Sequence, residues 1–196
     1  MAFYDSLSPS KLKSLANERL SDLIDKEAVR ARTSLEELQQ RYPSAGPREL
    51  SQRYIDSRKQ AASVLGGVTG VFGAVTVPVD LVGMVYLQLA LLVEIGTVFK
   101  ADFKNERGKK DVLDLFGYAN GIGPIQRASP KVLGSLAAMV LTKTGLKALG
   151  RAMPLVAAPI SAYLNNQHVQ RVGDSAIRHY DGWVHAHEKS KKASGS

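Results

Sequence analysis

Two acidic residues, Asp80 and Glu94, interrupt an otherwise uncharged stretch that runs from residue 61 to residue 99. Paired carboxylates are the groups with which glycoside hydrolases perform acid and base catalysis, and such pairs lie about 5–10 Å apart. On one helix these two acids would share a face, but their spacing would separate them by about 21 Å along the axis. They therefore do not form a catalytic dyad.

Each acid also has an interpretation of its own. Asp80 follows Pro78 in what we expect to be a first helical turn, where free N–H groups and the helix dipole favour a carboxylate. Glu94 has mainly apolar neighbours at helical spacing, and a buried carboxylate must be paired, hydrogen-bonded or protonated. Two interpretations of Glu94 follow: an ion pair with a basic residue of a neighbouring helix, or a polar anchor in a ligand cavity.

A second polar group comprises Asn165, Asn166, Gln167 and His168, directly after the apolar run PLVAAPISAYL. Buried amides commonly satisfy the backbone groups of loops, and the alternative for Asn165, Asn166 and His168 is again a ligand anchor. The other three histidines, His179, His185 and His187, include no pair at i, i+4, so no metal site is predicted. The chain has no cysteine and no G-x-S-x-G motif, and we expect neither a cofactor nor enzymatic activity.

The glycines of the stretch SVLGGVTGVFGAVTVPVDLVG recur at helical spacing, as Gly66, Gly70 and Gly73. A phosphate-binding loop would need a preceding strand and a Lys-Ser/Thr or G-x-G-x-x-G pattern, which the stretch lacks. Glycine costs a helix about 1 kcal/mol relative to alanine, so several on one face need a compensating gain. Close helix-to-helix approach supplies that gain, and these three glycines are predicted helix-packing positions. The later run GYANGIGP resembles a helix C-cap followed by a turn.

The apolar stretch also raises the question of a membrane span. Its uncharged pieces cover residues 61–79 and 81–93, whereas a spanning helix needs about 20 predominantly apolar residues. These lengths favour a buried helical hairpin, or one that dips into a single leaflet, over two true spans.

The net charge of +8 is unevenly placed, because no acidic residue lies between Asp114 and Asp174. Within this segment Lys143, Lys147 and Arg151 are spaced four apart, so one helix would carry them as a basic stripe bordered by leucines. Such a helix is suited to an anionic lipid surface, and the alternative is a solvent-facing stripe without a partner. Residues 125–160 contain no aromatic side chain, which argues against nucleic acid as the partner.

The elements that must position these residues are helical. Prolines after capping hydroxyls, a capping-box pattern at Ser34 and the breaker YPSAGP predict a series of helices. We place them near residues 9–31, 34–41, 48–75, 78–103, 110–120, 130–151 and 155–188. The predicted fold is an all-α, single-domain helical bundle with a Gly-rich central helical hairpin.

Three segments are expected along the chain. Residues 1–47 form an amphipathic helical N-terminal arm, residues 48–189 form the helical core, and residues 190–196 form a disordered polar tail. The arm would pack on its own core, on a second copy of the chain or on another protein, so an oligomer through the arm stays open. The N-terminus lacks the pattern of a secretory signal, so we expect a cytoplasmic protein.

Several motifs in order resemble the EcsC family over about residues 55–185. They are GGVTGVFGAVTVPVDLVGMVYLQLALLVEIGTVF, KKDVLDLF and AMPLVAAPISAYLNNQHVQRVGDSAIRHY. The family is bacterial and helical, and it is named for a gene near an ABC transporter. The resemblance implies a membrane-associated accessory role and no particular reaction.

Together these features predict a non-enzymatic accessory protein at the cytoplasmic face of a bacterial inner membrane. A basic helix would meet an anionic lipid surface or a membrane protein, while the Gly-rich hairpin packs as core or inserts. The alternative is a soluble helical module that binds an apolar ligand or a protein partner.

Overall fold

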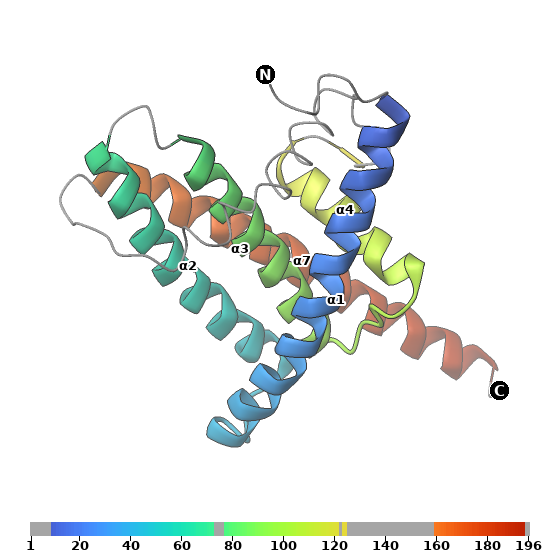
Figure 1. Cartoon of the computed structure of the whole chain (residues 1–196). Coiled ribbons are helices and arrows are strands. Elements are labelled where there is room, and N and C mark those ends of the chain that lie inside the picture. The colour runs from blue at the N-terminus through green and yellow to red at the C-terminus, as the bar shows by residue number, and fades with distance from the viewer. Residues whose placement is uncertain (1–8, 73–76, 122, 125–158, 195–196) are drawn as a thin grey trace.

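The computed structural model describes residues 9–72, 77–121, 123–124 and 159–194, and in this part of the chain every regular element is a helix (Figure 1). The helices are α1 (Pro9–Arg41), α2 (Pro47–Phe72), α3 (Val77–Val98), α4 (Glu106–Ala119) and α7 (Pro159–Ser194). The predicted all-α bundle is therefore confirmed. Three helices begin at a proline, a residue that suits the first helical position because the N–H it lacks has no partner there.

Helix α3 is the centre of the bundle. It contacts α1, α2, α4 and α7, and its residues 89–93 have no exposed surface. A helix that is apolar on every side must be surrounded, and α3 is apolar along most of its length. The sequence of α3 therefore makes it the helix around which the others pack.

Helix α1 is the predicted N-terminal arm, and it packs along α3. Leu20, Ile24, Ala28 and Ala31 are its buried apolar residues, so the arm contributes to the core of its own chain. The break predicted between residues 31 and 34 is wrong, because α1 continues without interruption to Arg41. The hydroxyl of Ser34 accepts a hydrogen bond from the Tyr54 hydroxyl at 3.2 Å instead of capping a new helix.

Helices α2 and α3 form the predicted hairpin, and α7 lies along α2 (Figure 1). Gly173 of α7 permits this contact, because a Cβ at that position would lie 2.4 Å from the Ile55 side chain of α2. Gly66 and Gly70 lie on α2, as predicted, whereas Gly73 lies outside the described residues. Helix α7 extends to Ser194, so residues 190–194 are helical where composition predicts a disordered tail.

The connection between α3 and α4 differs from the prediction at both ends. Helix α3 ends at Val98, not at residue 103, because Lys100 adopts a left-handed conformation with φ of 61°. The Ala101 N–H donates to the Gly96 carbonyl at 2.8 Å and the Lys100 N–H to the Thr97 carbonyl at 3.0 Å, which is a Schellman motif. The next helix begins at residue 106, not 110, because the Asn105 side chain caps it by accepting from the Gly108 N–H at 2.7 Å.

The end of α4 follows the prediction from GYANGIGP. The helix ends at Ala119, Asn120 is its C-cap, and Gly121 and Gly123 have φ of 71° and 76°. Glycine adopts these values without steric cost, which explains why the turn is rich in glycine.

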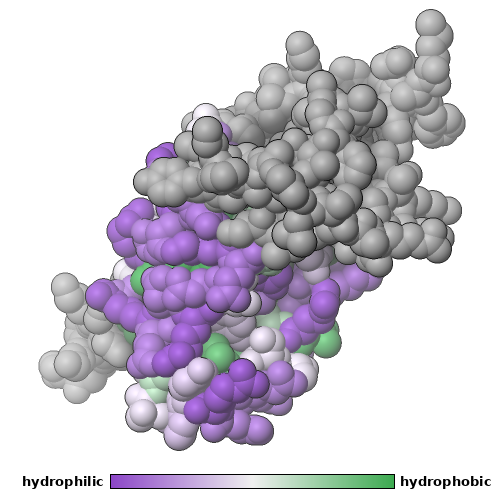
Figure 2. All heavy atoms as spheres, turned by 90° about the vertical axis from the view of Figure 1, so that its left-hand side faces the viewer, coloured by the Kyte–Doolittle hydropathy of each residue, from purple (hydrophilic) through white to green (hydrophobic). Residues whose placement is uncertain are grey.

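One face of the described surface is mainly hydrophilic, with apolar residues scattered singly over it (Figure 2).

Candidate functional site

Glu94 is buried in α3 and forms an ion pair with Arg58 of α2. The Arg58 guanidinium donates to both carboxylate oxygens, at 2.5 Å and 2.9 Å, and Glu94 is 8% exposed. Burial raises the pKa of Glu94, and the hydrogen bonds and charge of Arg58 oppose that rise. Of the two interpretations from sequence, the structure shows the ion pair with a neighbouring helix. With both oxygens occupied, Glu94 is a poor candidate for a general base.

A second buried carboxylate, Glu27 of α1, lies in the same region and was missed in the sequence analysis. The Tyr86 hydroxyl donates to Glu27 at 2.6 Å, and Arg30 donates to Glu27 at 3.0 Å and to the Tyr86 hydroxyl at 2.8 Å. Burial raises the pKa of Tyr86, and the bond to Glu27 raises it further. The signal was present, because residue 27 continues the helical spacing of Leu20 and Ile24 in an apolar stripe.

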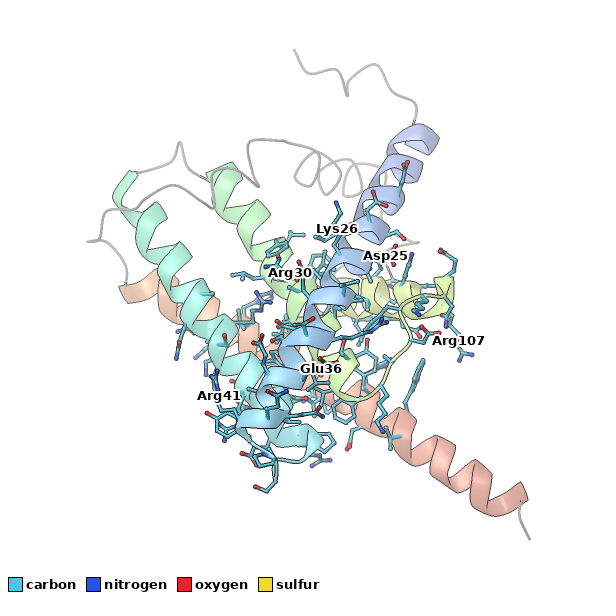
Figure 3. All side chains as sticks on the ribbon, turned by 60° about the horizontal axis from the view of Figure 1, so that its bottom comes forward. Asp25, Lys26, Arg30, Glu36, Arg41 and Arg107 are labelled. Atoms are coloured by element: carbon cyan, nitrogen blue, oxygen red, sulfur yellow. The ribbon has the colours of Figure 1, made fainter. Side chains whose placement is uncertain are left out.

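These five side chains form what we call the polar cluster: Glu27, Arg30, Arg58, Tyr86 and Glu94. They come from α1, α2 and α3, and Figure 3 shows Arg30 on α1 among the side chains around these helices. Each carboxylate has a guanidinium partner and each is shielded from solvent. The arrangement fixes the relative positions of three helices, which is a structural role.

His168 of α7 lies beside the end of α4, where it contacts Asn120. Its Nε2 is 3.1 Å from the Asn120 Oδ1, and the Asn120 amide donates to the Gln88 side chain at 2.7 Å and to the Phe116 carbonyl at 2.8 Å. Burial, together with the charge of Arg171, lowers the pKa of His168. The chain of polar contacts thus joins α3, α4 and α7, and it satisfies a carbonyl at the end of α4.

The other predicted anchor and anion-contact residues lie on α7 or outside the described residues. Asn166 is half-buried on α7, and Asn165 lies on the same helix with a side chain outside the described set. Lys143, Lys147 and Arg151 lie outside the described residues. Over the part of the chain that is described, no three His, Cys, Asp or Glu side chains are grouped so that they could hold a metal ion.

A cleft of about 200 Å³ opens between the α3–α4 connection, the first turns of α4 and α7. It is lined by Ala101, Asp102, Phe103, Asn105, Arg107, Gly108, Asp111, Tyr180 and Trp183. Sequence reasoning missed this cleft, because its wall comes from segments far apart in the chain. The only local sign was the grouping of Tyr180 and Trp183, the latter being the only tryptophan of the chain.

Close backbone approaches shape the cleft. A Cβ on Gly108 would lie 1.8 Å from the Asp102 carbonyl oxygen, and a Cβ on Gly96 would lie 2.4 Å from the Phe103 ring. Only glycine fits either place without movement of its neighbours. The aromatic wall is continuous, since Tyr180 and Trp183 meet edge to face with centroids 6.3 Å apart.

Two polar atoms of residues lining the cleft are buried with no hydrogen-bond partner among the described residues: the Tyr180 hydroxyl and Oδ2 of Asp111. Burial raises the pKa of Tyr180, and the nearby Asp111 charge adds to the rise, so the hydroxyl keeps its proton. At the rim, the Arg107 guanidinium lies 5.6 Å from the Trp183 ring centroid (Figure 3). The cleft thus combines an aromatic wall with unsatisfied hydrogen-bonding groups.

No family model matches this chain, and comparison with curated proteins and with solved structures finds no similar protein. None of the helices, over the described residues, has the length and apolar character that a membrane crossing requires.

Proposed function

We propose that this chain is a non-enzymatic accessory protein, related to the EcsC family, that acts at the cytoplasmic face of a bacterial membrane. The supporting observation is the distribution of charge along the α2–α3 hairpin. Between the Arg58–Glu94 pair and the ends of the two helices at Phe72 and Val77, Lys59 and Asp80 are the only charged residues of α2 and α3. The hairpin therefore has an apolar end beyond an ion-paired base.

The length of this apolar end suits a single leaflet. From residue 60 to Phe72, α2 rises about 20 Å, compared with about 15 Å for half of the hydrocarbon core. The backbone groups of a helix are hydrogen-bonded internally, so lipid contact leaves few of them unsatisfied. The apolar end lies on the far side of the molecule from the C-terminal end of α7 (Figure 1).

Asp80 limits the depth of insertion, because it lies in the first turn of α3, close to the tip. A carboxylate in hydrocarbon is costly, so the tip would reach the boundary between headgroups and acyl chains. The basic stripe of Lys143, Lys147 and Arg151 would add attraction to anionic lipid. At about 1 kcal/mol per basic side chain, the three would supply roughly a hundredfold in affinity.

Flotation with phosphatidylglycerol and phosphatidylcholine vesicles tests the electrostatic part. We expect the wild type to float with the anionic vesicles at low salt, and K143E/K147E/R151E to stay at the bottom of the gradient. The control K26E/R32E/R41E makes the same change of net charge at exposed positions of α1 and should float. Equal flotation of the stripe variant, or no flotation of the wild type, contradicts the proposed surface.

Insertion is tested separately by a fluorophore at the tip, since the natural chain contains no cysteine. Val71→Cys labelled with an environment-sensitive dye should shift to the blue on phosphatidylglycerol vesicles. The same dye on Ser57→Cys, an exposed position near the middle of α2, should not shift. Asp80→Asn should increase the response at residue 71. A bound chain with no shift at residue 71 would overturn insertion and leave only surface attraction.

The cleft favours a second proposal, a helical module that binds a ligand or a protein partner. Its volume of about 200 Å³ and its aromatic wall suit a small molecule with an apolar part. Dialysis of the purified chain against a small apolar probe, 1-butanol, measures whether the cleft retains it.

A further inference from the structure

The cleft between α4 and α7 lies away from the hairpin tip, and its chemistry points to a particular kind of ligand. We propose that this cleft binds a small soluble organic ammonium ion, with Asp111 and Tyr180 as hydrogen-bonding partners and Trp183 as part of the apolar wall. The inference is independent of the membrane proposal, because no part of it involves lipid.

The unpaired polar atoms of the cleft residues indicate that the ligand must donate hydrogen bonds. A buried carboxylate oxygen accepts hydrogen bonds only, so Oδ2 of Asp111 needs a donor. Among the described residues the Tyr180 hydroxyl also lacks a partner, and its oxygen can accept a second N–H from the same group. Native proteins leave few buried polar atoms unpaired, and of the six such atoms in the described residues two belong to residues that line this one cleft, where a ligand can supply the partner.

Charge distinguishes an ammonium ion from the alternatives. An anion would be repelled by the carboxylate of Asp111, although the start of α4 and Arg107 would attract it. A neutral donor would satisfy Asp111 without compensating its charge. A cation compensates that charge, and the two acids that line the cleft, Asp102 and Asp111, outnumber its single basic residue, Arg107.

The apolar wall accounts for an organic body on the ammonium group. Phe103, Tyr180 and Trp183 supply aromatic surface, and Ala101 and Gly108 are small residues of the same lining. A cleft of about 200 Å³ holds a molecule of a few heavy atoms, which excludes a peptide or a lipid tail. A short alkylammonium ion matches both the polar groups and the wall.

Because Trp183 is the only tryptophan of the chain, its fluorescence reports directly on the cleft. Three probes with a four-carbon body separate the contributions: n-butylammonium, 1-butanol and butyrate, titrated at pH 7 and constant ionic strength. We expect a saturable change for butylammonium, at least tenfold weaker binding of butanol, and no response to butyrate. Equal binding of butanol and butylammonium, or no saturable change at all, overturns the proposal.

Variants test the residue assignment. Asp111→Asn should weaken butylammonium binding at least tenfold, and Tyr180→Phe should weaken it several-fold. The control Asp114→Asn removes a carboxylate of the same helix that does not line the cleft, and it should bind like the wild type. Thermal denaturation with and without the probe gives a second readout, since a ligand that binds the folded state raises its melting temperature. Wild-type affinity in folded Asp111→Asn contradicts the assignment.

Discussion

Buried polar groups have hydrogen-bond partners in the polar cluster, whereas two buried polar atoms of cleft residues have none in the described part of the chain. In the polar cluster the Glu94 carboxylate is held at both oxygens by Arg58, and Glu27 accepts from Tyr86 and Arg30. Among the residues that line the cleft, Tyr180 and Asp111 each have a buried side-chain oxygen with no partner among the residues described. The polar cluster and the cleft both lie beside α3 or the connection at its end. The difference in hydrogen-bond pairing is therefore not caused by a difference in burial.

The difference shows how structural and functional polar groups can be separated from the structure of a single chain. A buried polar group that stabilises a fold must regain inside the protein the hydrogen bonds that it made with water. A buried group that lacks them costs stability unless a ligand or water supplies the partner. The polar cluster therefore indicates a fixed joint between helices, and the cleft indicates a binding site.

The largest expected effect comes from breaking the ion pair in the polar cluster. Glu94→Ala leaves the Arg58 guanidinium buried without its partner, and the free energy of unfolding should fall by about 3–5 kcal/mol. Urea unfolding followed by circular dichroism measures the change. The control Glu49→Ala breaks an exposed pair with Arg53 and should cost less than about 1 kcal/mol.

The double variant Arg58→Met/Glu94→Leu distinguishes a structural pair from a functional one. Apolar replacement of both partners of a buried pair is often neutral or stabilising, so the double variant should be much more stable than Glu94→Ala. A double variant that is as unstable as Glu94→Ala would mean that the pair has a role that packing cannot replace.

The next effect concerns how the cleft is held open. Gly108→Ala places a methyl group against the Asp102 carbonyl, which belongs to the backbone and cannot rotate away. The α3–α4 connection must then move, at a cost of about 1–3 kcal/mol, and Trp183 fluorescence should respond less to butylammonium. Gly182→Ala in α7 meets no atom within 4 Å and should instead stabilise its helix by up to about 1 kcal/mol. If both variants unfold alike, the close approach at Gly108 does not shape the cleft.

Sequence patterns predicted the helices because the signals are local. The prolines at residues 9, 47 and 159 lie at or near predicted helix starts, and GYANGIGP gave the end of α4. The wrong boundaries had both tertiary and local causes. Ser34 bonds to Tyr54, twenty residues away, and this contact replaces the local capping box. Lys100 takes a left-handed conformation that glycine or asparagine would ordinarily have signalled.

The candidate site could be predicted only in part. Glu94 was identified because an acid among apolar helical neighbours needs a partner, but the sequence could not name Arg58, thirty-six residues earlier. The cleft could not be found, since it requires residues near 105 and near 180 to meet. Periodicity shows which face of a helix is buried, and it does not show which helix covers that face.

The smallest expected effect is also the most direct test of the difference between the polar cluster and the cleft, because a tyrosine hydroxyl is removed from each of them. Tyr86→Phe deletes a hydroxyl that donates to Glu27 and accepts from Arg30, so the free energy of unfolding should fall by about 1.5 kcal/mol. Tyr180→Phe deletes a hydroxyl that is buried without a partner in the described structure, so stability should stay within about 0.5 kcal/mol of wild type or rise. Urea unfolding of both variants in ligand-free buffer measures the difference. If Tyr180→Phe costs as much as Tyr86→Phe, the Tyr180 hydroxyl has a structural partner, and the two regions do not differ in the way described. If it costs nothing in buffer but removes the stabilisation by butylammonium, the hydroxyl serves the ligand and not the fold.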